Sequence, residues 1–151
     1  MTRVHVTASR SYDVLIEPGL LDRAGPELRA VLPGARTAAV AADETVSALY
    51  GARLAASLEA AGFRTVSFVF PAGEGSKNLT TYAALLDFLG RNGLSRSDVL
   101  VALGGGVAGD LAGFAAATYQ RGMAFCQVPT SLLAAVDSSV GGKTGIDLPT
   151  G

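Results

Sequence analysis

The segment Asp137–Gly145, DSSVGGKTG, combines a carboxylate, a lysine and paired glycines. Gly142, Lys143 and Thr144 match the end of a phosphate-binding P-loop, G-x-x-x-x-G-K-[S/T]. Asp137 stands where that pattern requires its first glycine, and the preceding TSLLAAV is typical of a helix rather than a strand. ATP or GTP hydrolysis is therefore not expected. A carboxylate and an ammonium here suit a substrate with hydroxyl and anionic groups, or they form a surface ion pair.

A second glycine-rich segment, GGGVAG at Gly104–Gly109, fits the dinucleotide pattern G-x-G-x-x-G. Glycines allow a diphosphate to approach backbone amides where a helix begins. The acid that usually ends the next strand is missing, because that strand ends in Gln127-Val128-Pro129, and Asp110 follows the glycines at once. The pattern predicts a dinucleotide site that departs from the ordinary Rossmann order. A tight strand-to-helix turn without a ligand is the alternative.

Two further polar positions have chemistry suited to such a site. In PAGEGSK, Glu74 can accept hydrogen bonds from ribose hydroxyls, and Lys77 is a donor at the beginning of a helix. A solvated turn is the simpler interpretation of this segment alone. Asp43 ends an apolar run, and it either belongs to the site or caps the helix that begins at Glu44.

These residues need a scaffold, and the hydrophobic pattern predicts one. Short β-like runs at 4–8 and 12–16 indicate a hairpin, and a helix interrupted by Pro26 is expected over 19–32. Continuous apolar runs predict strands, and runs with helical spacing that end at glycine predict helices. The expected strands are 37–43, 65–70, 98–103 and 123–129, and the expected helices between them are 44–62, 79–93 and 106–122.

This alternation predicts one α/β domain, a Rossmann-like parallel sheet with helices on both faces. The carboxyl ends of parallel strands lie at one edge, where such sheets bind ligands. Asp43, PAGEGSK, GGGVAGD and VPTS all lie at or just after the carboxyl ends of expected strands. We therefore expect these four segments to form one site.

The bulk composition restricts the partners. The chain has 151 residues, 49% of them hydrophobic, and a net charge of −1, so no overall field attracts nucleic acid or a membrane. No long apolar run occurs, and a cytoplasmic, soluble protein is expected. The one cysteine, Cys126, is expected to be buried and to have no catalytic role. The one histidine, His5, is expected to be an ordinary strand residue. A histidine-rich zinc site cannot form within the chain.

Two long strings, GGGVAGDLAGFAAATYQRG and QVPTSLLAAVDSSVGGKTG, closely resemble the 3-dehydroquinate synthase family of sugar-phosphate cyclases. The resemblance runs from the hairpin to the last residue and is dense from position 98 onward. The uninterrupted DSSVGGKTG favours this family over the deoxy-inosose synthase type. A dehydrogenase of the glycerol or iron-dependent alcohol type shares the fold but gives no reason for DSSVGGKTG.

The resemblance implies an NAD-binding N-terminal domain, a helical C-terminal domain with zinc or cobalt, and an active centre between them. The residues that match NAD-contacting positions are Asp43, Glu74, Lys77, Gly105, Gly106, Val107, Gly109, Asp110, Thr130 and Ser131. Asp137 and Lys143 match positions at the substrate and nicotinamide end. Arg121 matches an arginine that reaches the substrate phosphate in the neighbouring subunit of a homodimer. Ser131 replaces a commoner threonine, and GIDLPTG replaces a frequent Asn-His-Pro stretch.

The implied reaction belongs to the shikimate pathway of aromatic amino acid biosynthesis. A lyase of this family converts 3-deoxy-arabino-heptulosonate 7-phosphate to 3-dehydroquinate and phosphate, with NAD regenerated in each turnover. Its metal ligands, one glutamate and two histidines, lie C-terminal to the stretch present here. We therefore expect 1–151 to be the NAD-binding part of a chain about twice as long, without catalytic metal and inactive alone. A non-catalytic NAD-binding module is the other alternative.

Overall fold

Four parallel strands form the central sheet of the computed structural model, which describes residues 1–151. The strands are β3 (Thr37–Asp43), β4 (Arg64–Phe70), β5 (Val99–Gly104) and β6 (Ala124–Pro129). Their order across the sheet is β4-β3-β5-β6, and every neighbouring pair is parallel. The predicted parallel sheet is confirmed. The two central strands are buried almost throughout, which explains why their sequences are continuously apolar.

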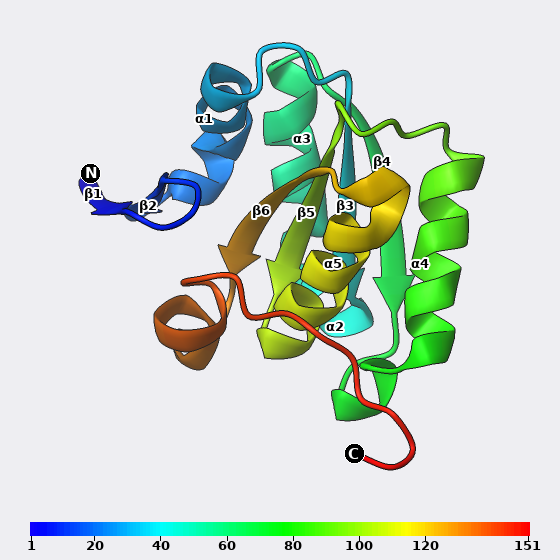
Figure 1. The fold of residues 1–151 in the computed structure, drawn as a ribbon. Coiled ribbons are helices and arrows are strands. Elements are labelled where there is room, and N and C mark those ends of the chain that lie inside the picture. Colours follow the sequence, from blue (N-terminus) through cyan, green and yellow to red (C-terminus); the bar gives the residue numbers. More distant parts are fainter.

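Helices cover both faces of the sheet, as predicted (Figure 1). The α-helices are α1 (Ala24–Val31), α2 (Glu44–Val46), α3 (Ala52–Ala60), α4 (Leu79–Arg91) and α5 (Gly106–Thr118). Alternate strand residues separate the core into two clusters. Ala39, Ala41 and Leu100 pack with α4 and α5, whereas Ala38 and Val40 pack with α1 and α3. None of the helices is long and apolar enough to cross a membrane.

The predicted hairpin is also confirmed, with β1 at Thr2–Val6 paired antiparallel to β2 at Tyr12–Ile16. It forms its own two-stranded sheet and lies beside the main sheet in Figure 1. Tyr12 fastens it to the distant DSSVGGKTG segment, because the Gly141 N–H donates to the Tyr12 hydroxyl at 2.6 Å.

Three expected helices are divided or shortened. The expected helix over 44–62 consists of α2, a π-helical turn at Ser47–Gly51, and α3. The expected helix over 19–32 begins as a 3₁₀ turn at Leu20–Arg23, and Pro26 then falls in the first turn of α1, where an N–H has no helical partner. The helix expected to reach residue 122 ends at Thr118 and continues as a separate 3₁₀ turn, Tyr119–Arg121.

Short helical turns complete the chain. A 3₁₀ turn, Glu74–Ser76, follows β4, and a π-helical turn, Ala134–Ser138, follows β6. The segment after Ser138 then runs back across α5 (Figure 1). A methyl group at Gly113 of α5 would collide with the Thr144 side chain, so this glycine permits the close crossing.

Candidate cofactor and active site

The glycine turn between β5 and α5 exposes the beginning of a helix. Gly105 is the N-cap of α5, and no side chain caps the helix. An added Cβ at Gly105 or Gly106 would have nothing closer than 3.8 Å, whereas a Cβ at Gly104 would lie 2.8 Å from the Ala108 Cβ. Gly104 is therefore required by packing, and Gly105 and Gly106 leave open space over the helix N-terminus. Such a terminus favours an anion.

A cluster of charges around the largely buried Lys77 and Asp110 lies beside this turn. The Lys77 Nζ is 3.5 Å from the Asp110 Oδ2, 3.5 Å from the Glu74 Oε2 and 3.8 Å from the Asp147 Oδ1. The Lys77 side chain is only 19% exposed. Burial alone would lower its pKa, but the charges of Glu74, Asp147 and Asp110 outweigh burial and raise the pKa above the ordinary lysine value. Lys77 therefore keeps its positive charge at neutral pH.

Asp110 has one oxygen that the chain leaves without a partner. Its Oδ2 faces Lys77, but its Oδ1 is buried and accepts no hydrogen bond. The Ser138 hydroxyl is likewise buried and unpaired, and it lies 3.8 Å from the Cβ positions of Gly106 and Gly109. Buried polar atoms normally have partners. Two unpaired ones beside an open helix N-terminus are consistent with a polar ligand at this place.

Thr130 and Ser131, which follow β6, lie next to the glycine turn between β5 and α5. The Thr130 N–H donates to the Gly104 carbonyl at 3.0 Å, and the Ser131 hydroxyl lies 3.8 Å from the Cβ position of Gly105. Ser131 also accepts from the Ala134 N–H at 3.2 Å, so it begins the following helical turn. Segments from β5 and β6 therefore meet, as predicted.

Asp43 lies at the same edge, at the end of β3. Its Oδ1 accepts from the Val46 N–H at 2.9 Å, so the helix-cap interpretation of this residue is what the structure shows. The next residue, Glu44, accepts from the Ala72 N–H at 3.4 Å and links this edge to the PAGEGSK segment. A ligand that contacts Asp43 therefore has the other carboxylate oxygen available.

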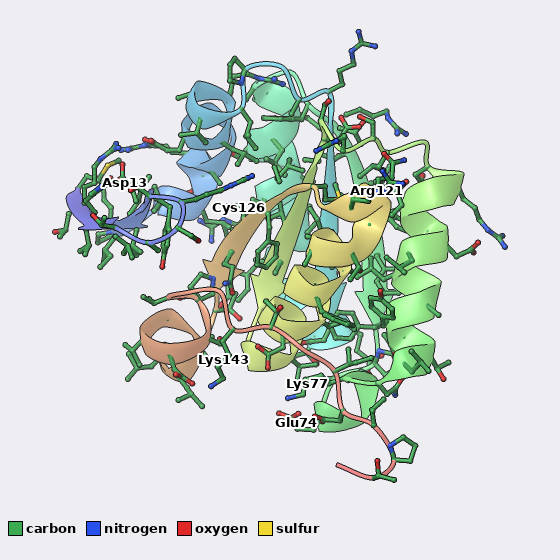
Figure 2. All side chains as sticks on the ribbon, in the orientation of Figure 1. Asp13, Glu74, Lys77, Arg121, Cys126 and Lys143 are labelled. Carbon is green, nitrogen blue, oxygen red and sulfur yellow. The ribbon has the colours of Figure 1, made fainter.

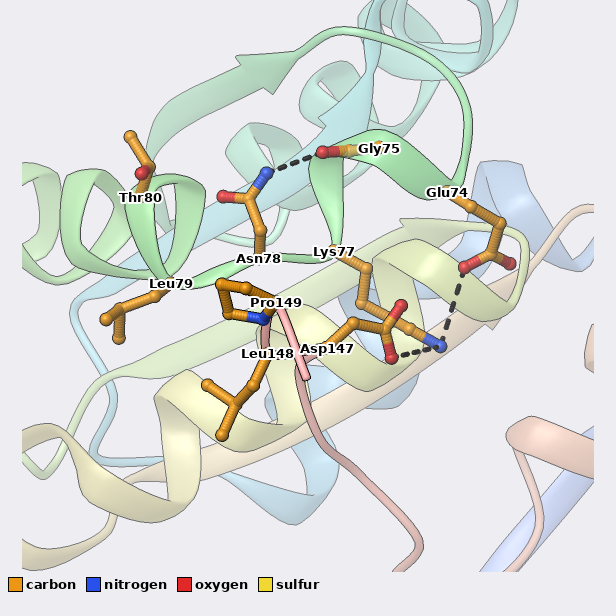
Figure 3. A pocket seen from close by; sticks show the side chains of 9 residues that line it. All are labelled: Glu74, Gly75, Lys77, Asn78, Leu79, Thr80, Asp147, Leu148 and Pro149. Carbon is orange, nitrogen blue, oxygen red and sulfur yellow. Dashed lines mark hydrogen bonds and ion pairs between the residues drawn. The ribbon is translucent and has the colours of Figure 1, made fainter. Parts of the chain in front are cut away.

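A hollow of about 440 Å³ opens next to Lys77 (Figure 3). The side chains that line it belong to Glu74, Gly75, Lys77, Asn78, Leu79, Thr80, Asp147, Leu148 and Pro149. The C-terminal segment forms one wall because the Asp147 N–H donates to the Lys77 carbonyl at 2.8 Å. In Figure 3 the carboxylates of Glu74 and Asp147 both turn toward the Lys77 ammonium.

The DSSVGGKTG segment has no P-loop geometry, because a helical turn rather than a strand precedes it. The Asp137 Oδ2 and the Lys143 Nζ are 3.9 Å apart and both side chains are largely exposed. They therefore form the surface ion pair that was the simpler alternative, and both groups remain accessible to a ligand. Figure 2 shows Lys143 at the same end of the molecule as Lys77 and Glu74.

Arg121 lies away from this edge. It precedes β6, near the amino ends of the strands, and Figure 2 shows it at the opposite end of the molecule from Lys77 and Lys143. The chain therefore does not bring Arg121 to the glycine turn. Cys126 and His5 take no part in the site: burial raises the pKa of the Cys126 thiol to about 11, and His5 pairs with Asp13 in the hairpin.

Three contributors were missed by sequence reasoning. Asp147 is the third acid around Lys77, Ser138 supplies the unpaired hydroxyl, and Gln127 holds that turn through a bond from its Nε2 to the Ser138 carbonyl at 3.2 Å. The Gln127 Oε1 also lies 2.7 Å from the Cβ position of Gly109, so a side chain at 109 would require Gln127 to move. The usual dinucleotide pattern has an acid at the end of the next strand, and here β6 has Gln127 near its end instead. That departure was the one signal in the sequence that could have indicated Gln127.

Comparison with known proteins places the chain in a family. The family model for the N-terminal part of 3-dehydroquinate synthase matches residues 67–151, more than half of the chain. The chain belongs to the 3-dehydroquinate synthase family. A curated 3-dehydroquinate synthase from Enterococcus faecalis (strain OG1RF) is 54% identical over 139 residues, 92% of this chain. The chain spans 38% of that relative's length.

Solved structures of related cyclases share the fold. A 2-deoxy-scyllo-inosose synthase complexed with carbaglucose-6-phosphate, NAD+ and Co²⁺ is 26% identical, with a TM-score of 0.89 over 99% of this chain and 41% of its own. The 2-epi-5-epi-valiolone synthase of Streptomyces hygroscopicus, with NAD+ and Zn²⁺ bound, is 35% identical, with a TM-score of 0.80 over 97% of this chain and 40% of its own. Glycerol dehydrogenase of Schizosaccharomyces pombe, at 19% identity and a TM-score of 0.59, covers 73% of this chain and 25% of its own and shares the fold alone.

Proposed function

We propose that the chain supplies the NAD-binding part of a 3-dehydroquinate synthase. The observation that carries the proposal is the uncapped N-terminus of α5, with open space over Gly105 and Gly106 and an unpaired buried oxygen on Asp110. The family membership supports NAD as the ligand, as does NAD+ in the two related cyclases.

The residues present fit a dinucleotide. In this proposal the amides at Gly105, Gly106 and Val107 hold the diphosphate, and Gly109 keeps the first turn free of a side chain. The Asp110 carboxylate, fixed by Lys77, accepts from a ribose hydroxyl through its unpaired oxygen. The remaining cofactor-binding residues of the proposal are Asp43, Glu74, Thr130, Ser131 and Lys143.

The substrate proposal uses the DSSVGGKTG segment. NAD, when bound, supplies the hydride acceptor and donor for converting 3-deoxy-arabino-heptulosonate 7-phosphate to 3-dehydroquinate and phosphate. Lys143 binds an anionic group of the substrate, and Asp137 accepts a hydrogen bond from a hydroxyl. Their exposed ion pair costs little to open, because surface pairs contribute only about 0–1 kcal/mol.

The family's metal has no counterpart in this stretch. No group of three or more histidine, cysteine or acidic side chains lies close enough together to hold a metal ion. We propose that residues 1–151 form one domain of a longer, cytoplasmic, two-domain enzyme. By themselves they release no phosphate from the substrate.

In this proposal Arg121 acts only in a homodimer, on the substrate of the neighbouring subunit. Its position at the amino end of the sheet, away from Lys143, supports a role toward the substrate of a neighbouring subunit rather than its own. A glycerol-dehydrogenase-like oxidoreductase remains the second candidate on the shared fold, and a non-catalytic NAD-binding module the third.

Calorimetric titration of the chain with NAD tests the cofactor proposal. The wild type should bind one NAD per chain, and Gly105→Ala should weaken binding about tenfold or more, because its methyl group enters the space needed by the diphosphate. Gly105 has ordinary dihedral angles, so the variant should fold. Gly34→Ala is the matched control, since a Cβ there meets nothing within 4 Å. Equal affinities for the two variants would reject the glycine turn as the diphosphate site.

A further inference from the structure

Asp147 contacts Lys77 through both its main chain and its side chain. The Asp147 N–H donates to the Lys77 carbonyl at 2.8 Å, and the Asp147 Oδ1 lies 3.8 Å from the Lys77 Nζ (Figure 3). The next residue, Asn78, forms an isolated parallel β-bridge with Asp147. These contacts fasten the C-terminal segment beside the turn that follows β4, although the two segments are distant in the sequence.

The Lys77 ammonium is shared by three carboxylates from three different segments. Glu74 belongs to the 3₁₀ turn after β4, Asp110 to α5 and Asp147 to the C-terminal segment. These three are the charged groups that face the ammonium. Because an ammonium has three N–H donors, three carboxylates can satisfy all of them. Loss of one carboxylate leaves a donor free to turn elsewhere, and the place of the ammonium is then less well fixed.

The place of the ammonium decides which oxygen Asp110 presents to a ligand. Lys77 faces the Asp110 Oδ2, and the Oδ1 is buried and unpaired. The segment that carries Asp147 also touches Asp110 directly, because the Gly145 N–H donates to the Asp110 carbonyl at 3.3 Å. One segment therefore contacts both members of the Lys77–Asp110 pair.

We propose that Asp147 is a positioning residue of the NAD site, which holds the Lys77 ammonium against Asp110 so that the unpaired Asp110 oxygen stays directed at a ribose hydroxyl. The inference rests on the proposed function, because it concerns the same site. Asp147 acts through Lys77 and need not touch the cofactor. The family resemblance assigns Asp147 no such task, since GIDLPTG departs there from the frequent Asn-His-Pro stretch.

The test combines a titration of Lys77 with NAD calorimetry in Asp147→Asn. The variant keeps the main-chain bond to the Lys77 carbonyl and removes only the charge. Burial alone would lower the pKa of Lys77, and the Asp147 charge is one of the three that outweigh burial, so this pKa should fall in the variant. Lys77 and Lys143 are the two lysines of the chain, so ¹H–¹³C NMR can follow the Lys77 ε-methylene group with the Lys143 signals as an internal reference.

NAD affinity should fall about three- to fivefold in Asp147→Asn, as expected for a partly exposed ion pair. Asp147→Glu restores a carboxylate and should recover most of the affinity and of the Lys77 pKa. Asp22→Asn is the matched control, because the Asp22 side chain is similarly exposed, 57% against 60%, and pairs with Arg53 instead of Lys77. It should leave the Lys77 pKa unchanged and NAD affinity within about twofold.

An unchanged Lys77 pKa in Asp147→Asn would overturn the inference. A lowered pKa with unchanged NAD affinity would overturn it too, since Asp147 would then form only a surface ion pair. Equal weakening by Asp147→Asn and Asp22→Asn would assign the effect to overall charge and would also refute it. A wild-type chain that binds no NAD would reject the proposed function and this inference with it, so the wild-type titration distinguishes the two failures.

Discussion

In the proposed NAD site, single residues at the carboxyl edge of the sheet have two tasks, one in folding and one toward the ligand. Asp43 caps α2 with one oxygen and keeps the other available. Asp110 pairs with Lys77 through one oxygen and leaves the other buried without a partner. An unpaired buried acceptor costs free energy, about 1–3 kcal/mol, which a ligand donor would recover. This cost at Asp110 supports the proposal that the carboxyl edge binds a ligand.

Cys126 illustrates the opposite case, a half-buried side chain whose surroundings lower its reactivity. Burial raises the pKa of its thiol to about 11, so its thiolate fraction at pH 7.5 should be about 300-fold smaller than that of a free cysteine. We expect labelling by a thiol-specific disulfide reagent to be slower by more than tenfold in the native chain than in urea. Equal rates in the two conditions, followed by absorbance, would contradict this assignment.

Several residue positions could not be foreseen. The motif residues Gly104–Asp110 were found because their pattern is local and lies next to a recognisable strand. The pairing of Lys77 with Asp147 joins residues 70 positions apart, and no local pattern encodes it. The same is true of the contact between Tyr12 and Gly141.

At the scale of elements, the strands follow directly from the sequence because burial on both faces demands continuous apolar runs. The residues expected at 37–43 are those of β3, and β5 differs from its expected range by one residue at each end. The helices were less well predicted. The π-helical turns and the left-handed residues Gln120 and Arg121 arise from packing and from side-chain bonds to other segments, which helical spacing does not report.

Asp98 is the residue that ties elements together at the amino edge. The residue is only 6% exposed. Its Oδ1 accepts from the Arg36 and Thr37 N–H groups, and its Oδ2 accepts from the Ser95 N–H and hydroxyl. Burial alone would raise its pKa, but these bonds outweigh it and lower the pKa below the ordinary value of 3.8. One carboxylate thereby joins the beginnings of β3 and β5.

We expect Asp98→Asn to lower the free energy of unfolding by about 2–3 kcal/mol, because an amide nitrogen cannot accept from Ser95. Since the folded pKa is below the unfolded one, this contribution is present above about pH 4 and is lost as the pH falls through the folded pKa. Urea unfolding at pH 7 and pH 3 measures both effects.

Asp87→Asn is the control, because that carboxylate is exposed and paired only with Arg91. It should change the free energy of unfolding by no more than about 0.5 kcal/mol. If the deficit of Asp98→Asn did not shrink on acidification, its carboxylate would not be the stabilising form.

At the scale of the whole molecule, the two edges of the sheet differ in the charged groups that they carry. The carboxyl edge has an open helix N-terminus beside acidic side chains and Lys77, and the amino edge has three unpaired arginines, Arg10, Arg96 and Arg121. A net charge of −1 conceals this separation. The chain spans about 38% of the length of the curated relative from Enterococcus faecalis.

A crystal structure of the chain grown with NAD tests the central claim most directly. The account predicts the diphosphate over the first turn of α5, about 3 Å from the amides of Gly106 and Val107, with a ribose hydroxyl on Asp110. NAD bound elsewhere, with the glycine turn empty and the Asp110 oxygen still unpaired, would contradict it.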